Sequence, residues 1–275
     1  MSTQKVGALL DQISNLPTVP KVVRELMSEF DRPETDIDRV VFLMRSDPTL
    51  AARVLRLANS AFYGRKGEVS RLQDAVVFVG THATRNLVLS VGLAGAIKFP
   101  NDFPRQSFWR YSLHSAVASR YVASMSRQDA ETAFALGLMR AIGEPLVATI
   151  HNKELIEVDS SCAFFDQTRL AAEHDKLGFH FLDVTAELAD RWHFPKEMIA
   201  ALRQTVQPDD SSAGKMGAAV AVGAWIAGEY ESKSKNPDWM PETIRTKLRL
   251  TGVSDDLRDM PPLPKLAEGL EALVA

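Results

Sequence analysis

The hydrophobic residues of this chain recur at helical spacing over most of its length. After Pro20, apolar residues return every three or four positions as far as Phe30, which predicts an amphipathic helix there. The same spacing follows Asp36 and follows Asp47-Pro48. Aspartate is favoured at the N-cap of a helix and proline in its first turn, so both positions predict helix starts. The N-terminal third is therefore expected to be helical.

The pattern resumes after a break at residues 100–104, where prolines and polar residues interrupt it. It predicts helices over residues 108–125, from Ala130 to a stop at Gly143, and over 168–175, 182–192, 195–206 and 214–230. Residues 76–79 are β-like in composition, but this run is too short and isolated to found a sheet. The predicted fold class is all-α with two helical lobes, residues 1–100 and residues 101–275, the second including a C-terminal extension.

The composition is that of an ordinary globular chain, with 45% hydrophobic and 24% charged residues and a formal net charge of -3. Residues 1–100 hold 13 Lys and Arg against 10 Asp and Glu, too slight an excess to indicate a clustered basic face. Residues 80–89 superficially resemble a helix-turn-helix, but the apolar residues that follow leave only a narrow polar face. Nucleic acid is therefore disfavoured as a partner.

A single cysteine, Cys162, excludes a disulfide within the chain and a cysteine-based zinc site, and it fits a reducing compartment. The N-terminus carries a Lys and an Asp too early for a signal peptide. The longest uncharged apolar runs, residues 87–97 and 216–228, are shorter than the ~20 residues of a membrane-spanning helix. We therefore expect a cytoplasmic protein without a membrane partner.

Three stretches of the chain resemble one protein family. They are LPTVPKVVRELM, SDPTLAARVLRLANSAFYG and LQDAVVFVGTHATRNLVLS, which carry Asp47-Pro48 and Asn59-Ser60 at the family's spacing. The family is HDOD, the HD-related output domain, and the resemblance covers residues 14–210. It implies two helical lobes, the second related to HD-type phosphohydrolases, and a role as an output module in bacterial signalling, often beside cyclic-dinucleotide pathways. No general catalytic activity belongs to the family.

The resemblance also identifies where an HD hydrolase would hold its metals. The adjacent His-Asp pair lies in a Gly-Leu-Leu-His-Asp-Ile-Gly-like run, and this chain has Gly137-Leu138-Met139-Arg140-Ala141-Ile142-Gly143 instead. Arg140 replaces the histidine and Ala141 replaces the aspartate, and neither offers a metal ligand. The other aligned ligand positions hold Tyr111, Phe181, Thr205 and Val206. The second lobe is therefore interpreted as a degenerate HD domain with no metal, no cofactor and no catalytic residue.

Several single residues have a structural interpretation beside a functional one. Arg140 either fills the vacated site with its own positive charge or is an exposed arginine near carbonyls at a helix end. His114 on an amphipathic helix is interpreted as a satisfied or surface histidine rather than a ligand. Cys162 has apolar neighbours, which favours a buried and inert thiol.

The candidate binding residues are mostly basic. The family-motif residues are interpreted as mainly structural, because Asx residues at helix ends usually bond locally; they are Asp47, Pro48, Asn59, Ser60 and Gly80. The polar loop over residues 59–67 is the alternative, an interaction surface. The candidate interaction residues are Arg53, Arg56, Arg65, Lys66 and Arg140. A cleft between the lobes is the default place for a small ligand, with Arg140 as the first contact if a nucleotide binds.

The sequence therefore predicts a non-enzymatic signal-transduction module that acts by contact with other signalling proteins. The most specific form of this prediction places it in cyclic-dinucleotide-linked regulation. Two alternatives stay open. One is a degenerate metal-dependent phosphohydrolase, and the other is a regulator that binds a nucleotide or a nucleic acid. The sequence names no partner.

Overall fold

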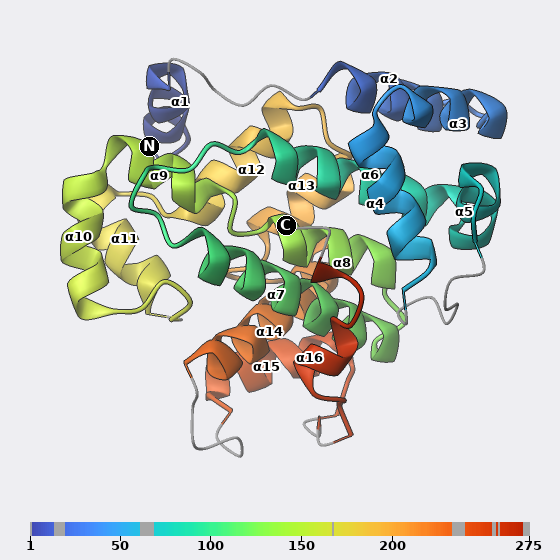
Figure 1. Cartoon of the computed structure of the whole chain (residues 1–275). Helices are drawn as coiled ribbons and strands as arrows, with labels where there is room; N and C mark the ends of the chain where they lie inside the picture. Colours follow the sequence, from blue (N-terminus) through green and yellow to red (C-terminus); the bar gives the residue numbers. More distant parts are fainter. Residues whose placement is uncertain are drawn as a thin grey trace. The chain divides into compact units, whose positions relative to one another are not determined.

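The computed structural model describes residues 2–13, 20–60, 69–166, 168–232, 240–254, 257 and 259–271. These residues form sixteen helices and no strand (Figure 1), which confirms the predicted all-α class. The chain divides into two compact units. The first unit comprises Met1–Pro17 and Ile97–Leu263, and the second comprises Thr18–Ala96 and Pro264–Ala275.

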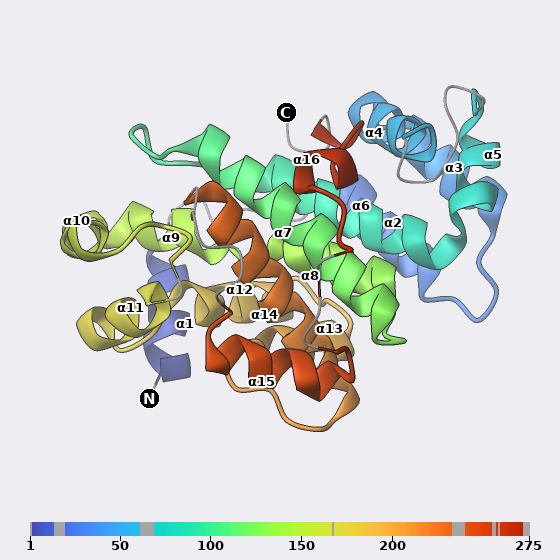
Figure 2. The same ribbon diagram turned by 90° about the horizontal axis from the view of Figure 1, so that it is seen from below.

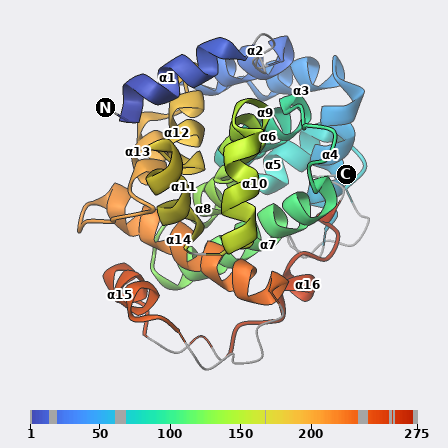
Figure 3. The ribbon, with the colours of Figure 1, turned by 90° about the vertical axis from the view of Figure 1, so that its left-hand side faces the viewer.

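The N-terminal helix α1 (Ser2–Gln12) belongs to the first unit, although the second unit follows it along the chain. Helix α1 packs against α12 (Phe181–Arg191), as Figure 3 shows, and its residues Val6 and Leu10 are buried. The last twelve residues belong to the second unit. The two units therefore differ from the predicted lobes 1–100 and 101–275, because the N-terminal residues belong to the first unit and the C-terminal residues to the second.

The described residues between 21 and 96 of the second unit, which leave out 61–68, form five helices. They are α2 (Lys21–Phe30), α3 (Ile37–Arg45), α4 (Pro48–Ala58), α5 (Leu72–Val79) and α6 (Thr81–Ala96). Asp36 accepts hydrogen bonds from two backbone N–H groups at the start of α3, and Asp47 does the same for α4, so both predicted N-caps are confirmed. The β-like run lies within helix α5, which Gly80 ends with a φ of +87°.

The first unit is built around two long helices that lie side by side, α7 (Arg105–Met125) and α14 (Ser212–Glu231), as Figure 2 shows. A Cβ on Gly223 of α14 would lie 2.4 Å from the backbone nitrogen of Ser119 in α7, so this close approach requires glycine. The remaining helices of the first unit are α8 (Ala130–Met139), α9 (Gly143–Ile150), α10 (Asn152–Ser161), α11 (Arg169–Leu177), α13 (Lys196–Arg203) and α15 (Glu242–Thr251). The short helix α16 (Leu263–Leu266) begins at the last residue of the first unit and continues into the second.

The helix predicted from Ala130 ends earlier than expected. Helix α8 stops at Met139, residues 140–142 form a turn, and Gly143 begins α9 instead of ending α8. The stretch Ala130–Ile150 is long and apolar enough by composition to cross a membrane, but 83% of its apolar window is buried inside the structure. These two helices therefore supply part of the core of the first unit.

Candidate functional site

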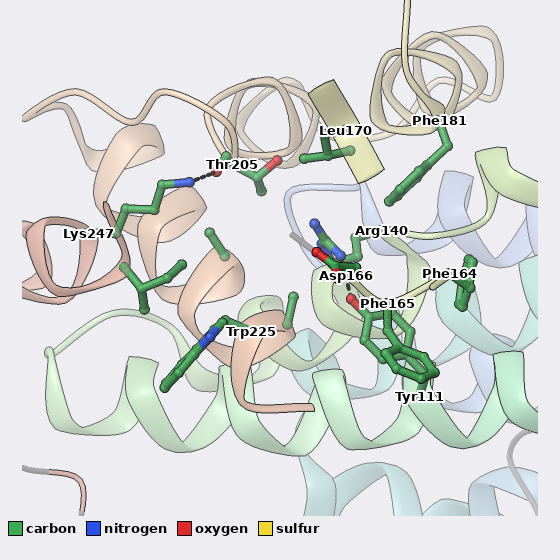
Figure 4. Close-up of a pocket in the computed structure, with 13 residues that line it drawn as sticks. Tyr111, Arg140, Phe164, Phe165, Asp166, Leu170, Phe181, Thr205, Trp225 and Lys247 are labelled. Atoms are coloured by element: carbon green, nitrogen blue, oxygen red, sulfur yellow. Dashed lines mark hydrogen bonds between the residues drawn. The ribbon is translucent and has the colours of Figure 1, made fainter. Parts of the chain in front are cut away.

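Four of the positions aligned with HD metal ligands line a single pocket of the first unit, with a volume of about 90 Å³. One of them lies on helix α7 and one in the turn after α8. The third is the first residue of α12, and the fourth lies just after α13. They are Tyr111, Arg140, Phe181 and Thr205, drawn in Figure 4. Ala141 is fully buried and Val206 half-buried, and neither is among the lining residues.

Arg140 is buried, with 7% of its surface exposed, so the interpretation of an exposed helix-end arginine is wrong. Its Nη1 donates a hydrogen bond to the Tyr111 hydroxyl at 2.7 Å, and its Cζ lies 5.6 Å from the centroid of the Phe181 ring. Its Nε has no hydrogen-bond partner, and none of the ion pairs found among the described residues involves it. Arg140 therefore brings an unneutralised positive charge to the position of the expected His-Asp pair.

Tyr111 forms the wall beside Arg140 and is itself buried. Its ring packs edge-on against Phe164, with 5.4 Å between the ring centroids. Burial raises the pKa of the Tyr111 phenol, and the charge of Arg140 opposes that rise. Since the phenol stays protonated at neutral pH and already accepts from Arg140, its own O–H is available to a second acceptor.

Lys247 also lines the pocket, and no sequence motif predicted it there. It lies on α15, and its Nζ donates to the backbone carbonyl oxygen of Thr205 at 3.0 Å (Figure 4). Burial and the neighbouring charge of Arg140 lower the pKa of Lys247 to about 8. Helix α15 lies beyond the family resemblance, so no motif marked it. The available signal was a lysine beside the buried Ile244 and Leu248, on the apolar face of an amphipathic segment.

The family-motif residues belong to the second unit. Asn59 follows α4, and its Nδ2 donates both to the Leu55 carbonyl oxygen at 3.0 Å and to the Val69 carbonyl oxygen at 2.6 Å. The Val69 N–H donates back to Asn59 Oδ1 at 2.9 Å. The Ser60 hydroxyl donates to the Leu57 carbonyl oxygen at 2.6 Å. Both side chains therefore bond locally to the backbone.

The basic interaction candidates are divided between the two units. Arg140 belongs to the first, whereas Arg53 and Arg56 lie on α4 of the second. Arg56 is exposed and Arg53 is half-buried. Burial lowers the pKa of Arg53, and the positive charge of Arg56 lowers it further, whereas the charge of Asp47 raises it. Arg65 and Lys66 lie outside the described residues.

The described part of the chain contains no group of three or more His, Cys, Asp or Glu side chains arranged to hold a metal ion. His114 is buried, and its Nδ1 lies 2.9 Å from Oε1 of Glu231. Burial lowers the pKa of His114, and the hydrogen bond to Glu231 opposes the change. Cys162 is also buried, with its Sγ 3.5 Å from the Val158 carbonyl oxygen.

The sequence pattern of the HDOD domain matches residues 16–208. A curated relative, an uncharacterized protein of Treponema pallidum (strain Nichols), is 25% identical over 214 residues; these cover 74% of this chain but only 40% of the relative's length. Among solved structures, a Shewanella amazonensis SB2B protein with a provisional phosphohydrolase name is 26% identical, with a TM-score of 0.74 over 98% of both chains. An HDOD domain protein of unknown function from Geobacter sulfurreducens is 23% identical, with a TM-score of 0.68 over 99% of this chain and 92% of its own.

Proposed function

Because this chain belongs to the HDOD domain family, a family related to signal transduction, we propose that it is a cytoplasmic regulatory module that binds partner proteins and does not hydrolyse phosphoesters. One observation carries the proposal. Two cationic side chains, Arg140 and Lys247, line the pocket at which the aligned ligand positions meet. A link to cyclic-dinucleotide regulation is the finer form of the proposal, and the family resemblance supports it.

The charge of the pocket opposes the chemistry of an HD hydrolase. Such an enzyme needs a divalent cation to lower the pKa of bound water and to stabilise phosphate charge. Two like unit charges 4 Å apart cost about 4 kcal/mol near a protein surface, and a divalent ion doubles that cost. Carboxylate or imidazole ligands would offset this repulsion, but Ala141 and Phe181 have no ligand atoms, and the carboxylate among the described lining residues, Asp166, is exposed to solvent. The pocket therefore favours an anion over a metal ion.

A degenerate metal-dependent phosphohydrolase is the alternative function. The provisional phosphohydrolase name of the Shewanella relative, at 26% identity over nearly the whole chain, favours it. That name describes the relative. In this chain the residues at the corresponding pocket, above all Arg140, argue against the same activity.

Metal retention and turnover distinguish the two functions. Purified protein incubated with Mn²⁺, Fe²⁺ or Zn²⁺ and then dialysed is expected to retain far less than one metal ion per chain in elemental analysis, because the pocket repels cations. We also expect no hydrolysis of cyclic dinucleotides or of p-nitrophenyl phosphoesters. A metal-retaining HD hydrolase taken through the same dialysis is the control. Stoichiometric metal that disappears in His114→Ala, or metal-dependent turnover, would contradict the proposal.

The second unit offers a surface for a protein partner. Helices α3 and α5 pack against each other, and each exposes a large apolar side chain. Phe42 of α3 is 63% exposed and Val77 of α5 is 64% exposed. Exposed apolar side chains mark an interaction site where they form a contiguous patch. This surface supports the partner-binding half of the proposal.

Replacing both Phe42 and Val77 by serine is expected to abolish partner binding, because it removes the apolar contact area while leaving the buried face of each helix intact. The measurement is quantitative mass spectrometry of proteins recovered with the tagged chain from cells that naturally contain it. The control is Ile156→Ser, which changes a 59% exposed residue on α10 of the first unit. If the double variant recovers the same proteins as the unchanged chain, the partner does not use this surface.

A further inference from the structure

The pocket around Arg140 has the features of an anion site. We propose that it binds a phosphoryl group, held by Arg140, Lys247 and the indole N–H of Trp225. The group is either free phosphate or the end of a small phosphate monoester. This inference goes beyond the proposed function, since neither partner binding nor the absence of hydrolysis requires a small-molecule ligand.

Two buried donors in the pocket lack acceptors. Arg140 Nε and Trp225 Nε1 have no hydrogen-bond partner among the described residues, although these side chains are only 7% and 9% exposed. Both residues line the pocket, and Figure 4 shows the Arg140 guanidinium directed into the space among the lining side chains. Buried N–H groups are nearly always paired in folded proteins, so an acceptor that is not part of the described chain is expected in the pocket.

The charge of the pocket matches a phosphoryl group. Arg140 and Lys247 carry two positive charges, and the only acid among the lining residues that the structure describes, Asp166, is exposed to solvent. Asp166 Oδ1 already accepts from the backbone N–H and the hydroxyl of Thr168, each at 2.8 Å. A phosphate monoester carries about −1.5 to −2 charges and three acceptor oxygens at pH 7. It would therefore neutralise both cations and satisfy both free donors, which a single carboxylate does less completely.

The size of the pocket limits the ligand. A volume of about 90 Å³ holds a phosphoryl group but is well below the roughly 300–1,000 Å³ of sites for larger ligands. A second pocket of about 370 Å³ adjoins it and shares Phe165, Asp166 and Trp225. Its walls also include Pro241 and the acidic Glu229. The adjoining space therefore suits a small apolar body and disfavours a second phosphate, which argues against a cyclic dinucleotide.

Calorimetry with inorganic phosphate and with phenyl phosphate tests the site on the full chain. We expect saturable binding that weakens at least tenfold in Arg140→Lys and in Lys247→Met, because each substitution removes a charge or a directed donor. The matched control is Lys153→Met, which removes an exposed lysine of α10 in the same unit and is expected to leave the affinity unchanged. Phenyl phosphate binding at least tenfold more tightly than phosphate would identify a monoester as the ligand. Equal affinities would identify free phosphate.

The indole N–H of Trp225 gives a second readout that does not depend on the Arg140 variant folding. In ¹⁵N-resolved NMR spectra, its resonance, assigned by its absence in Trp225→Phe, is expected to move downfield as phosphate is added. The same shift is expected to be lost in Lys247→Met. No binding of either probe at 10 mM, or binding that persists in Lys247→Met with an unmoved Trp225 resonance, would overturn the proposal. The metal and turnover tests of the proposed function would be unaffected by that failure.

Discussion

Replacing Arg169 by methionine is expected to lower the free energy of unfolding by about 3–5 kcal/mol, the usual cost of removing one partner from a buried ion pair. Arg169 is almost fully buried in the first unit. Its guanidinium pairs with Glu144, with Glu173 at 2.8 Å from Nε to Oε1, and with Asp159 at 2.6 Å from Nη1 to Oδ1. Methionine fills similar volume but leaves two buried carboxyl groups without a cation.

The loss of stability in this variant is expected to depend on pH. Burial raises the pKa of Glu144 well above its ordinary value, the charge of Glu173 adds to the rise, and Arg169 opposes it. A carboxyl with a raised pKa stabilises the folded state while it is protonated, below its ordinary pKa, and that contribution is lost as the pH rises through the raised value. Without Arg169 the rise is larger, so the defect is expected to be greatest at pH 8 and smaller toward pH 5.

Urea unfolding followed by circular dichroism measures this effect. The matched control is Lys176→Met, which breaks the exposed pair between Lys176 and Glu157 and is expected to cost less than about 1 kcal/mol. Combining Arg169→Met with Glu144→Gln and Glu173→Gln is expected to restore part of the stability, because no buried charge remains unpaired. An Arg169→Met protein as stable as the Lys176→Met protein would show that the buried network contributes nothing.

Gly143→Ala is expected to destabilise the first unit by about 3 kcal/mol or more, at the upper end for overpacking a core. A Cβ at this position would lie 2.0 Å from the backbone carbonyl oxygen of Phe181 and 2.9 Å from the backbone nitrogen of Thr185. These are backbone atoms of α12, so they cannot move without shifting the helix. The Gly143 N–H also donates to the Thr185 hydroxyl at 2.9 Å, and that hydroxyl donates to the Arg140 carbonyl oxygen at 2.8 Å. The shift would therefore displace Arg140 as well.

A second glycine provides the comparison for this experiment. Gly95 lies in helix α6 and is exposed, and a Cβ there would meet nothing within 4 Å. Gly95→Ala is expected to raise stability by about 0.5–1 kcal/mol, because alanine loses less backbone entropy in a helix. Thermal unfolding of both variants measures the contrast. Equal melting temperatures for Gly143→Ala and the unchanged chain would disprove the close contact between α9 and α12.

The elements that the sequence could predict are those with a strong local signal. Asp36 and Asp47 cap their helices as expected, because capping needs only the residue and its next three neighbours. The family resemblance also predicted three residues that line the pocket, Tyr111 on α7, Arg140 in the turn after α8 and Phe181 on α12. Helices α1, α10 and α15 were not predicted. Helices α10 and α15 begin without a side-chain N-cap hydrogen bond, so the local start signal that marked α3 and α4 is absent there.

The properties of the pocket could not be predicted from local sequence in the same way. Whether Arg140 is buried or exposed depends on what covers the turn after α8, and Tyr111 and Phe181 lie far from it along the chain. Lys247 reaches the pocket from a helix outside the matched residues. Trp225 lines it from α14, for which the sequence predicted a helix and no site residue. Burial of charge is a tertiary property, so these residues emerge only from the folded chain.

The amide of Asn59 has a consequence for protein engineering. It bonds the Leu55 carbonyl oxygen of its own helix and both backbone groups of Val69, so the residues on either side of 61–68 are held together by two hydrogen bonds. The entropy cost of closing a loop grows slowly, by about 0.6 kcal/mol for each doubling of its length. A reporter peptide inserted between Asn59 and Val69 would therefore lengthen a loop whose two ends are already joined by hydrogen bonds. The second unit could carry a label there at a small cost in stability.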